Sequence, residues 1–217
     1  MSPKPLRERR RARTWQAIHA AASTLAATKG LRETTIEQIA EQAGVSTRTF
    51  FNYFATKEDA ILGISTLELT DQMLEQDAQR GDNRLIVRLT HLLLTIVRAG
   101  FGGTDIEQIR QNINRYPELM NRVKVHNHHA ENLLRDFLTR VDWERFTTAG
   151  YRGPFPLHPA EHAPEPNADQ QQMIESMLHL ASAILRQVRF GDQIDDVHLL
   201  DTQIRALADS YTTILTY

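Results

Sequence analysis

The chain has 217 residues, 41% of them hydrophobic, and carries 25 Lys or Arg against 27 Asp or Glu. It is long and apolar enough to fold into one or two globular domains, which excludes a largely disordered chain, and its lack of cysteine excludes disulfides and thiolate metal sites. No apolar stretch approaches the length of a membrane span and no apolar segment follows the basic N-terminus, so we expect a cytoplasmic protein with no membrane partner.

Positive charge is concentrated at the N-terminus. Residues 1–60 carry ten Lys or Arg against six Asp or Glu, whereas residues 61–217 carry fifteen against twenty-one. Six of the ten lie in the first thirteen positions: Lys4, Arg7, Arg9, Arg10, Arg11 and Arg13. Such a stretch is either a solvated tail or a mobile arm that neutralises nucleic-acid phosphates. Beside a DNA-binding motif, the phosphate role is favoured.

Three helices are predicted in the first 56 residues. Apolar residues recur at helical spacing before Gly30, which predicts a helix from about residue 8 to Lys29. Thr34 and Glu37 have the spacing of a capping box, so a second helix is expected to begin near Thr35. Gly44 is expected to end this helix in a left-handed conformation.

The third helix carries side chains suited to DNA. Ser46 can cap its start, and Val45, Phe50 and Phe54 are expected to anchor it to the core. Four polar residues are then left facing outward: Thr47, Arg48, Thr49 and Asn52. Two helices around a glycine turn, followed by such residues, indicate a helix-turn-helix. Arg48 is the best candidate base reader, because its guanidinium matches the N7 and O6 acceptors of guanine.

The remaining chain also has helical patterns, and strand-like alternation is absent. Thr56 and Asp59 predict the start of a helix over residues 57–74, and the segment 83–99 is apolar on more than one side, as expected for a central helix. Further helices are expected over 104–114, opened by Thr104 and Glu107, and over 117–141, opened by Pro117. The fold class is therefore all-α, with about nine helices.

The C-terminal part combines an irregular loop with two regular helices. Five of the eight prolines lie between Pro154 and Pro166, so residues 150–168 are predicted to form a loop. An acidic run, Asp192, Asp195 and Asp196, is expected to be a solvated turn before the last helix. The two helices have apolar seams at alternating steps of three and four residues: Ile174, Met177, Ala181, Ile184 and Val188 in one, and Val197, Leu200, Ile204, Leu207, Tyr211 and Ile214 in the other. These seams suit either a four-helix dimer interface, which we favour, or the core of the same chain.

The run from Thr34 to Lys57 resembles the signature of TetR-type bacterial transcriptional repressors. The shared features are Thr-Ile, Ile-Ala, Ala-Gly-Val-Ser, the aromatic-rich Phe-Phe-Asn-Tyr-Phe and a lysine two residues beyond the following alanine. The resemblance implies a helix-turn-helix domain over residues 1–56 and a larger helical ligand-binding and dimerisation domain over residues 57–217. It further implies a homodimer that binds a palindromic double-stranded DNA operator and is released by a small-molecule effector.

By position, the resemblance assigns groove contacts to Thr47, Arg48 and Thr49, with Ser46 beside them. It places Phe51, Asn52 and Tyr53 along the DNA backbone, and Thr35 and Lys57 on phosphates, with Arg7 and Arg11 of the basic arm as further DNA contacts. Phe51 departs from the family pattern, because a tyrosine whose hydroxyl contacts a phosphate is usual there. Candidate pocket residues for the effector are Leu89, Leu93, Met120, Phe137, Trp143 and Met177, although plain core is the favoured interpretation for most of them, because core and pocket have the same periodicity.

A metal protein or metal-dependent enzyme with an all-α fold is the competing hypothesis. His126, His128 and His129 cluster on one predicted helix, and imidazole is a common metal ligand. Only His126 and His129 share a helix face, Glu131 is the nearby carboxylate on their C-terminal side, and no HExxH, GxSxG or phosphate-binding loop is present. We therefore expect no metal site, no cofactor and no catalytic residues.

Overall fold

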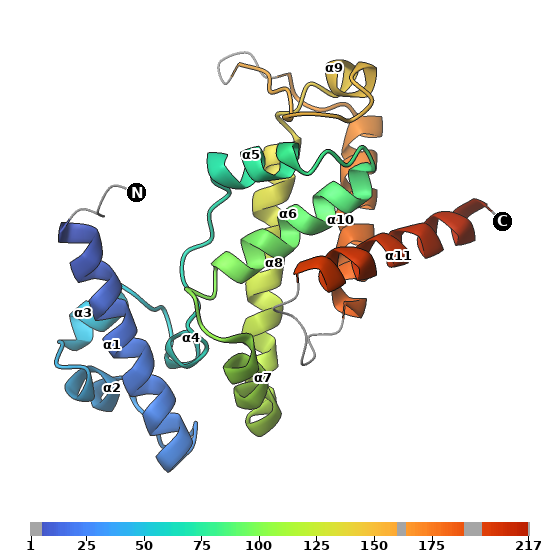
Figure 1. The fold of residues 1–217 in the computed structure, drawn as a ribbon. Coiled ribbons are helices and arrows are strands. Elements are labelled where there is room, and N and C mark those ends of the chain that lie inside the picture. The colour runs from blue at the N-terminus through green and yellow to red at the C-terminus, as the bar shows by residue number, and fades with distance from the viewer. Residues whose placement is uncertain (1–5, 160–163, 189–196, 217) are drawn as a thin grey trace. The chain divides into compact units, whose positions relative to one another are not determined.

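The computed structural model describes residues 6–159, 164–188 and 197–216. Within these ranges the chain forms eleven α-helices and one short 3-10 helix (Figure 1), and the sole β-type pairing is an isolated bridge between Val141 and Leu157. The predicted all-α fold is confirmed. Among the described residues, no helix combines the length and apolar character needed to cross a membrane.

The chain divides into two compact units. The first unit contains the chain up to Thr66 together with Gly100–His126. Its helices are α1 (Leu6–Lys29), α2 (Ile36–Gln42), α3 (Thr47–Phe51), α4 (Lys57–Leu62), α7 (Ile106–Arg115), the 3-10 helix η1 (Pro117–Leu119) and the start of α8 (Met120–Leu138). In this unit α1 packs against α2 and α4, α2 against α3, and α7 against α4. We call α1 to α3 with their connecting turns the head.

The second unit contains Leu67–Ala99 and the chain from Asn127 onward. Its helices are α5 (Asp71–Gln79), α6 (Leu85–Ala99), the rest of α8, α9 (Trp143–Thr148), α10 (Ala168–Gln187) and α11 (Val197–Thr216). Helix α6 packs against α5, α10 and α11, and ten of its fifteen residues are buried. The prediction of a central helix over residues 83–99 is thereby confirmed.

The expected helix over residues 57–74 is wrong. Helix α4 ends at Leu62, Gly63 follows in the left-handed region at φ 69°, and α5 begins at Asp71 after an N-cap by Thr70. Gly63 also lies so close to Thr104 that an added Cβ would sit 2.0 Å from the threonine hydroxyl oxygen. The break is therefore a tertiary requirement, and together with the unexpected α9 it raises the number of α-helices from about nine to eleven.

Two predicted helix caps are displaced by one residue. The capping box of α2 is formed by Thr35 and Gln38 rather than by Thr34 and Glu37. Thr34 is buried, and its hydroxyl donates to the Gly30 carbonyl 2.8 Å away. Helix α7 is likewise capped by Asp105, whose carboxylate accepts from the Glu107 N–H, rather than by Thr104.

The proline-rich segment is a loop, as predicted, over residues 150–159 and 164–167. The long helix opened by Pro117 is present as η1 followed by α8, and it ends at Leu138 rather than at Val141. The acidic run Asp192, Asp195 and Asp196 lies outside the described residues.

Candidate DNA-binding site

The turn between α2 and α3 is closed by backbone hydrogen bonds. Gly44, at φ 67°, donates to the Glu41 carbonyl at 3.1 Å, and the Val45 N–H donates to the Ala40 carbonyl at 2.9 Å. This pair of bonds is a Schellman motif, which satisfies the last carbonyls of α2 and requires a left-handed residue. Glycine adopts that conformation without a Cβ clash, so the predicted role of Gly44 is confirmed.

Ser46 then starts α3. Its hydroxyl accepts a 3.0 Å hydrogen bond from the Thr49 N–H and lies 2.9 Å from the Thr49 hydroxyl. The predicted N-cap is confirmed. Because the two hydroxyls already contact one another, Ser46 and Thr49 are held as part of the helix start, whereas the Thr47 and Arg48 side chains extend from the exposed side.

Helix α3 has one buried and one open face. Phe50 is completely buried and packs against Phe54, whose ring centroid lies 5.6 Å from that of Trp15 in α1. The exposed side carries Thr47, Arg48 and Asn52, as predicted, with Tyr53 half-buried. Phe51 is also on the surface, with 56% of its area exposed. The aromatic anchors therefore hold α3 while its polar side chains stay free to enter a groove.

The basic residues near the N-terminus lie in the first helix of the head. Arg7, Arg9, Arg10, Arg11 and Arg13 all belong to α1, which begins at Leu6, and all five are exposed. The expected mobile arm is therefore wrong for these residues, while Lys4 lies outside the described part of the chain. Arg7 and Arg11 are four residues apart and share a helix face. Positive charge at a helix N-terminus opposes the helix dipole, so this cluster is poorly explained by stability alone.

Lys57 has a structural set of contacts that the sequence did not indicate. Its ammonium donates to the carbonyl oxygens of Leu31 and Thr34, each at 2.8 Å, and more weakly to Arg32 at 3.4 Å. These carbonyls belong to the connection between α1 and α2. Lys57 thus fastens the start of α4 to that connection, and the phosphate contact expected from the family resemblance would compete with these three bonds. Thr35 is exposed at the adjoining start of α2.

Residues 18–62 match the family model for bacterial regulatory proteins of the tetR family. Over these residues, the chain is similar to the DNA-binding region of that family. Members of this family are DNA-binding transcriptional regulators, which is consistent with the open face of α3.

Three solved structures illustrate what this chain is similar to. NalD, the secondary repressor of the MexAB-OprM multidrug efflux pump in Pseudomonas aeruginosa, is 24% identical, with 88% of this chain and 94% of that chain covered and a TM-score of 0.37. Salmonella enterica GusR is 16% identical, with 95% of this chain and 96% of that chain covered and a TM-score of 0.37. Thermus thermophilus FadR, a TetR-family transcriptional repressor in complex with lauroyl-CoA, is 17% identical, with 90% of this chain and 91% of that chain covered and a TM-score of 0.34. No curated protein matches the chain.

The tetR-type head is tied to the segment 106–126 within the first unit. Arg122 of α8 makes a bidentate ion pair with the buried Asp59 of α4, with nitrogen–oxygen distances of 2.7–2.9 Å. The Tyr116 hydroxyl donates to the Ala26 carbonyl at 2.6 Å, near the end of α1. This segment therefore contacts the start of α4 and the end of α1, a connection that sequence periodicity does not reveal.

The predicted pocket residues fall into different environments. Leu89 and Leu93 are buried in α6, and Met177 is half-buried in α10. Phe137 and Trp143 belong to an aromatic cluster: Phe137 packs edge-on against Phe155, Trp143 against Phe146, and Phe146 against Phe155. Met120 belongs to the first unit and is 39% exposed, whereas the other five belong to the second. Their role as pocket residues stays a prediction.

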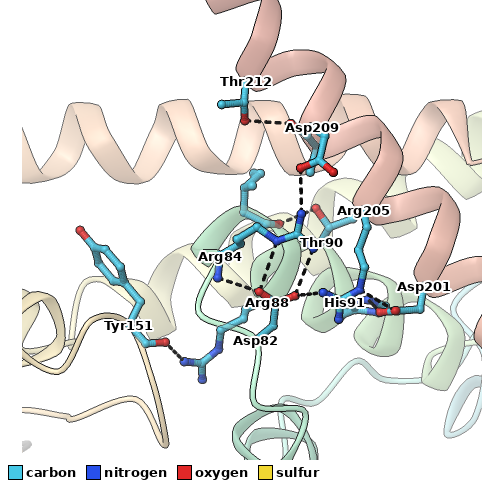
Figure 2. Close-up of polar contacts among 12 residues, drawn as sticks. Asp82, Arg84, Arg88, Thr90, His91, Tyr151, Asp201, Arg205, Asp209 and Thr212 are labelled. Carbon is cyan, nitrogen blue, oxygen red and sulfur yellow. Dashed lines mark hydrogen bonds and ion pairs between the residues drawn. The ribbon is translucent and has the colours of Figure 1, made fainter. Parts of the chain in front are cut away.

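A buried cation supports the aromatic cluster. The Arg88 guanidinium of α6 lies over the rings of Phe155 and Phe146, 4.5 and 5.1 Å from their centroids, and pairs with Asp77 of α5. It also donates to the Tyr151 and Gly153 carbonyls, the first of which is visible in Figure 2. Burial raises the pKa of Asp77, although the Arg88 hydrogen bond and charge oppose that shift. Sequence reasoning missed this site because Arg88 occupies a core position of an otherwise apolar helix.

A charge network joins α11 to the start of α6 (Figure 2). Arg205 pairs with Asp82 and Asp201, and Arg84 lies 2.8 Å from Asp209. His91 is buried, and its Nε2 lies 2.8 Å from Asp201. Burial, assisted by the charge of Arg80, lowers the pKa of His91, so the imidazole is neutral at pH 7 and its Nε2–H donates to the carboxylate.

Part of each apolar seam of α10 and α11 is buried within the single chain. Ile174, Ala181 and Ile184 of α10 and Val188 at its C-cap are buried, as are Leu200 and Ile204 of α11. Burial within the single chain accounts for these positions without a dimer, and their part in a dimer interface stays a prediction. Met177, Leu207 and Tyr211 are half-buried and stay predictions for a dimer interface. The side chains of Val197 and Ile214 lie outside the description.

The histidine cluster does not support the metal hypothesis. His126 is buried with its ring 4.6 Å from that of Phe101, whereas His128 and His129 are exposed, and His128 lies 3.6 Å from Glu131. In the part of the chain that the structure describes, no three His, Asp or Glu side chains are grouped to hold a metal ion. The alternative of a metal-dependent enzyme is therefore unsupported.

Proposed function

We propose that the protein is a homodimeric transcriptional repressor that binds a palindromic double-stranded DNA operator and is released by a small-molecule effector. The observation that carries this proposal is the construction of α3: a serine-capped helix whose Phe50 is buried and whose Thr47 and Arg48 are open to solvent. A regulator of this kind acts in the bacterial cytoplasm by binding rather than by catalysis.

The DNA contacts follow from exposure and chemistry. Arg48 presents a planar guanidinium suited to guanine, and Thr47 and Thr49 offer hydroxyl and methyl groups to neighbouring bases. Asn52, Tyr53 and Thr35 are proposed to lie along the sugar–phosphate backbone. Arg7 and Arg11, exposed on one face of α1, are proposed to contact phosphates and to contribute to the salt dependence of binding.

Two heads are required to read a palindrome. A two-fold dimer places its recognition helices about 34–36 Å apart, which matches successive major grooves on one face of the duplex. An effector that binds more tightly to a conformer with a different head spacing weakens operator binding by its difference in affinity for the two conformers. The Arg122–Asp59 pair supports a route for this coupling, because it joins α8 to the helix that follows the head.

The test is selection of a duplex from a random library, followed by affinity measurement at several salt concentrations. We expect one enriched palindromic sequence, bound at least about 1,000-fold more tightly than random duplex at physiological salt. Light scattering of the complex should give two chains per duplex. Equal affinity for selected and random DNA would overturn the proposal, whereas specific binding by a single chain would overturn only the dimer.

A further inference from the structure

Phe51 is the apolar exception on the open face of the head. It is the last residue of α3, and 56% of its area is exposed, although the neighbouring Phe50 is fully buried. The two rings meet edge-to-face with centroids 5.6 Å apart. This contact orients the Phe51 ring without covering it. A large exposed phenyl ring is unfavourable in water and calls for a partner when the head is in use.

The position of Phe51 on the helix identifies its surroundings in a DNA complex. Residues three and four apart share a helix face, so Phe51 lies on the same side as Arg48 and Thr47. With a rise of about 1.5 Å per residue, Phe51 is about 4.5 Å further along the axis than Arg48. Base pairs are stacked about 3.4 Å apart, so the ring comes next to the base pair adjacent to the one that Arg48 reads.

The chemistry of the ring restricts what it can contact there. A phenyl group has no hydrogen-bond donor for a phosphate or a base edge, whereas the thymine 5-methyl is the apolar group in the major groove. Resting on the proposed DNA-binding function, we propose that Phe51 is a specificity-determining residue that recognises a thymine methyl group one base-pair step from the guanine bound by Arg48. Each half-site then carries one such thymine.

The test replaces each thymine of the selected duplex by deoxyuridine, which removes the methyl group and leaves the base pairing unchanged. For the unaltered protein, we expect one position per half-site at which uracil lowers the affinity about fourfold, the value of one buried methyl group. Phe51→Ala should bind the thymine and uracil duplexes equally. Phe51→Tyr, which keeps the ring, should still distinguish them.

Thr47→Ser tests the rival assignment, because it removes a methyl group from the same face of α3. The uracil effect should persist in Thr47→Ser; its loss there, together with its retention in Phe51→Ala, would assign the methyl contact to Thr47. A uracil scan without any sensitive position would also overturn the recognition of a thymine methyl by Phe51. The Phe51 ring would then pack on deoxyribose instead. If Phe51→Ala unfolds, Phe51→Gln gives the same comparison. Failure to select any duplex would instead contradict the proposed function itself.

Discussion

The two units use polar contacts of different kinds. In the first unit, several side chains donate hydrogen bonds to backbone carbonyls. Lys57 donates to the carbonyls of Leu31 and Thr34, and Tyr116 donates to that of Ala26. In the second unit, charged side chains mainly meet one another, as in the Arg88–Asp77 pair and the Arg205 network. Bonds to carbonyls hold helix ends in place, which suits a surface that must match rigid DNA. Paired charges depend on each other, so loss of one leaves the other uncompensated.

The largest expected effect follows from removing the buried cation of the second unit. Arg88→Met should lower the free energy of unfolding by about 3–5 kcal/mol, because Asp77 is left buried without its partner. Urea unfolding measures this change. The double variant Arg88→Met/Asp77→Asn should recover much of the loss, and Arg145→Met, at an exposed position, should be nearly neutral. A loss below about 1 kcal/mol in Arg88→Met would show that the buried Asp77 does not depend on Arg88 for compensation of its charge.

The next effect concerns binding rather than stability. Arg48→Ala should lose about 1–3 kcal/mol of discrimination between the selected duplex and its guanine-substituted variant, without shifting the urea midpoint, because Arg48 is exposed. Arg7→Ala should instead weaken binding to all duplexes similarly and reduce the salt slope by about one. The reverse pattern would show that α1 reads bases and α3 only positions the head.

Lys57 tests whether carbonyl-directed bonds stabilise the head. Lys57→Met should cost about 1–2 kcal/mol of stability, with the partial exposure of the side chain keeping the loss at the lower end for a charged donor. Lys29→Met, exposed at the end of α1, is the matched control and should change stability little. If Lys57→Met weakens DNA binding while leaving the urea midpoint unchanged, the Lys57 ammonium contacts a DNA phosphate rather than stabilising the fold.

The smallest expected effect is a pH dependence in each unit. Burial lowers the pKa of His91 in the second unit and of His19 in the first, so each imidazole stays neutral in the folded chain below the unfolded pKa of about 6.5. The unfolded chain then binds more protons, so stability is fully present above about pH 6.5 and falls as the pH drops toward the folded pKa. Each histidine contributes a slope of at most about 1.4 kcal/mol per pH unit.

His91→Gln and His19→Gln separate the two contributions. Each variant should flatten the pH dependence of the urea midpoint below about pH 6.5, by the share of the histidine it removes. His128→Gln, at an exposed position, is the control and should leave the profile unchanged. A steeper profile in His91→Gln would mean that the imidazole is protonated beside Asp201 in the folded chain.

Local sequence signals predicted most helices and the turn of the head. Gly44, Ser46 and Thr56 act as expected, because each cap depends on a side chain and on backbone groups within three residues. Local signals could not choose between Thr34 and Thr35, since Glu37 and Gln38 complete the same pattern for either. The choice was made by burial, which directs the Thr34 hydroxyl to the Gly30 carbonyl and leaves Thr35 at the helix start.

By itself, the sequence determined the helical class, the helix-turn-helix and the polar residues that α3 exposes to solvent, because those properties follow from periodicity and capping along a short stretch of chain. The tertiary structure alone decided that α4 ends before Gly63, that part of the α10 and α11 seams is buried within the chain, and that Arg88 and Lys57 hold distant segments together. These outcomes depend on contacts between residues far apart in the chain, where neither spacing nor residue type specifies the partner.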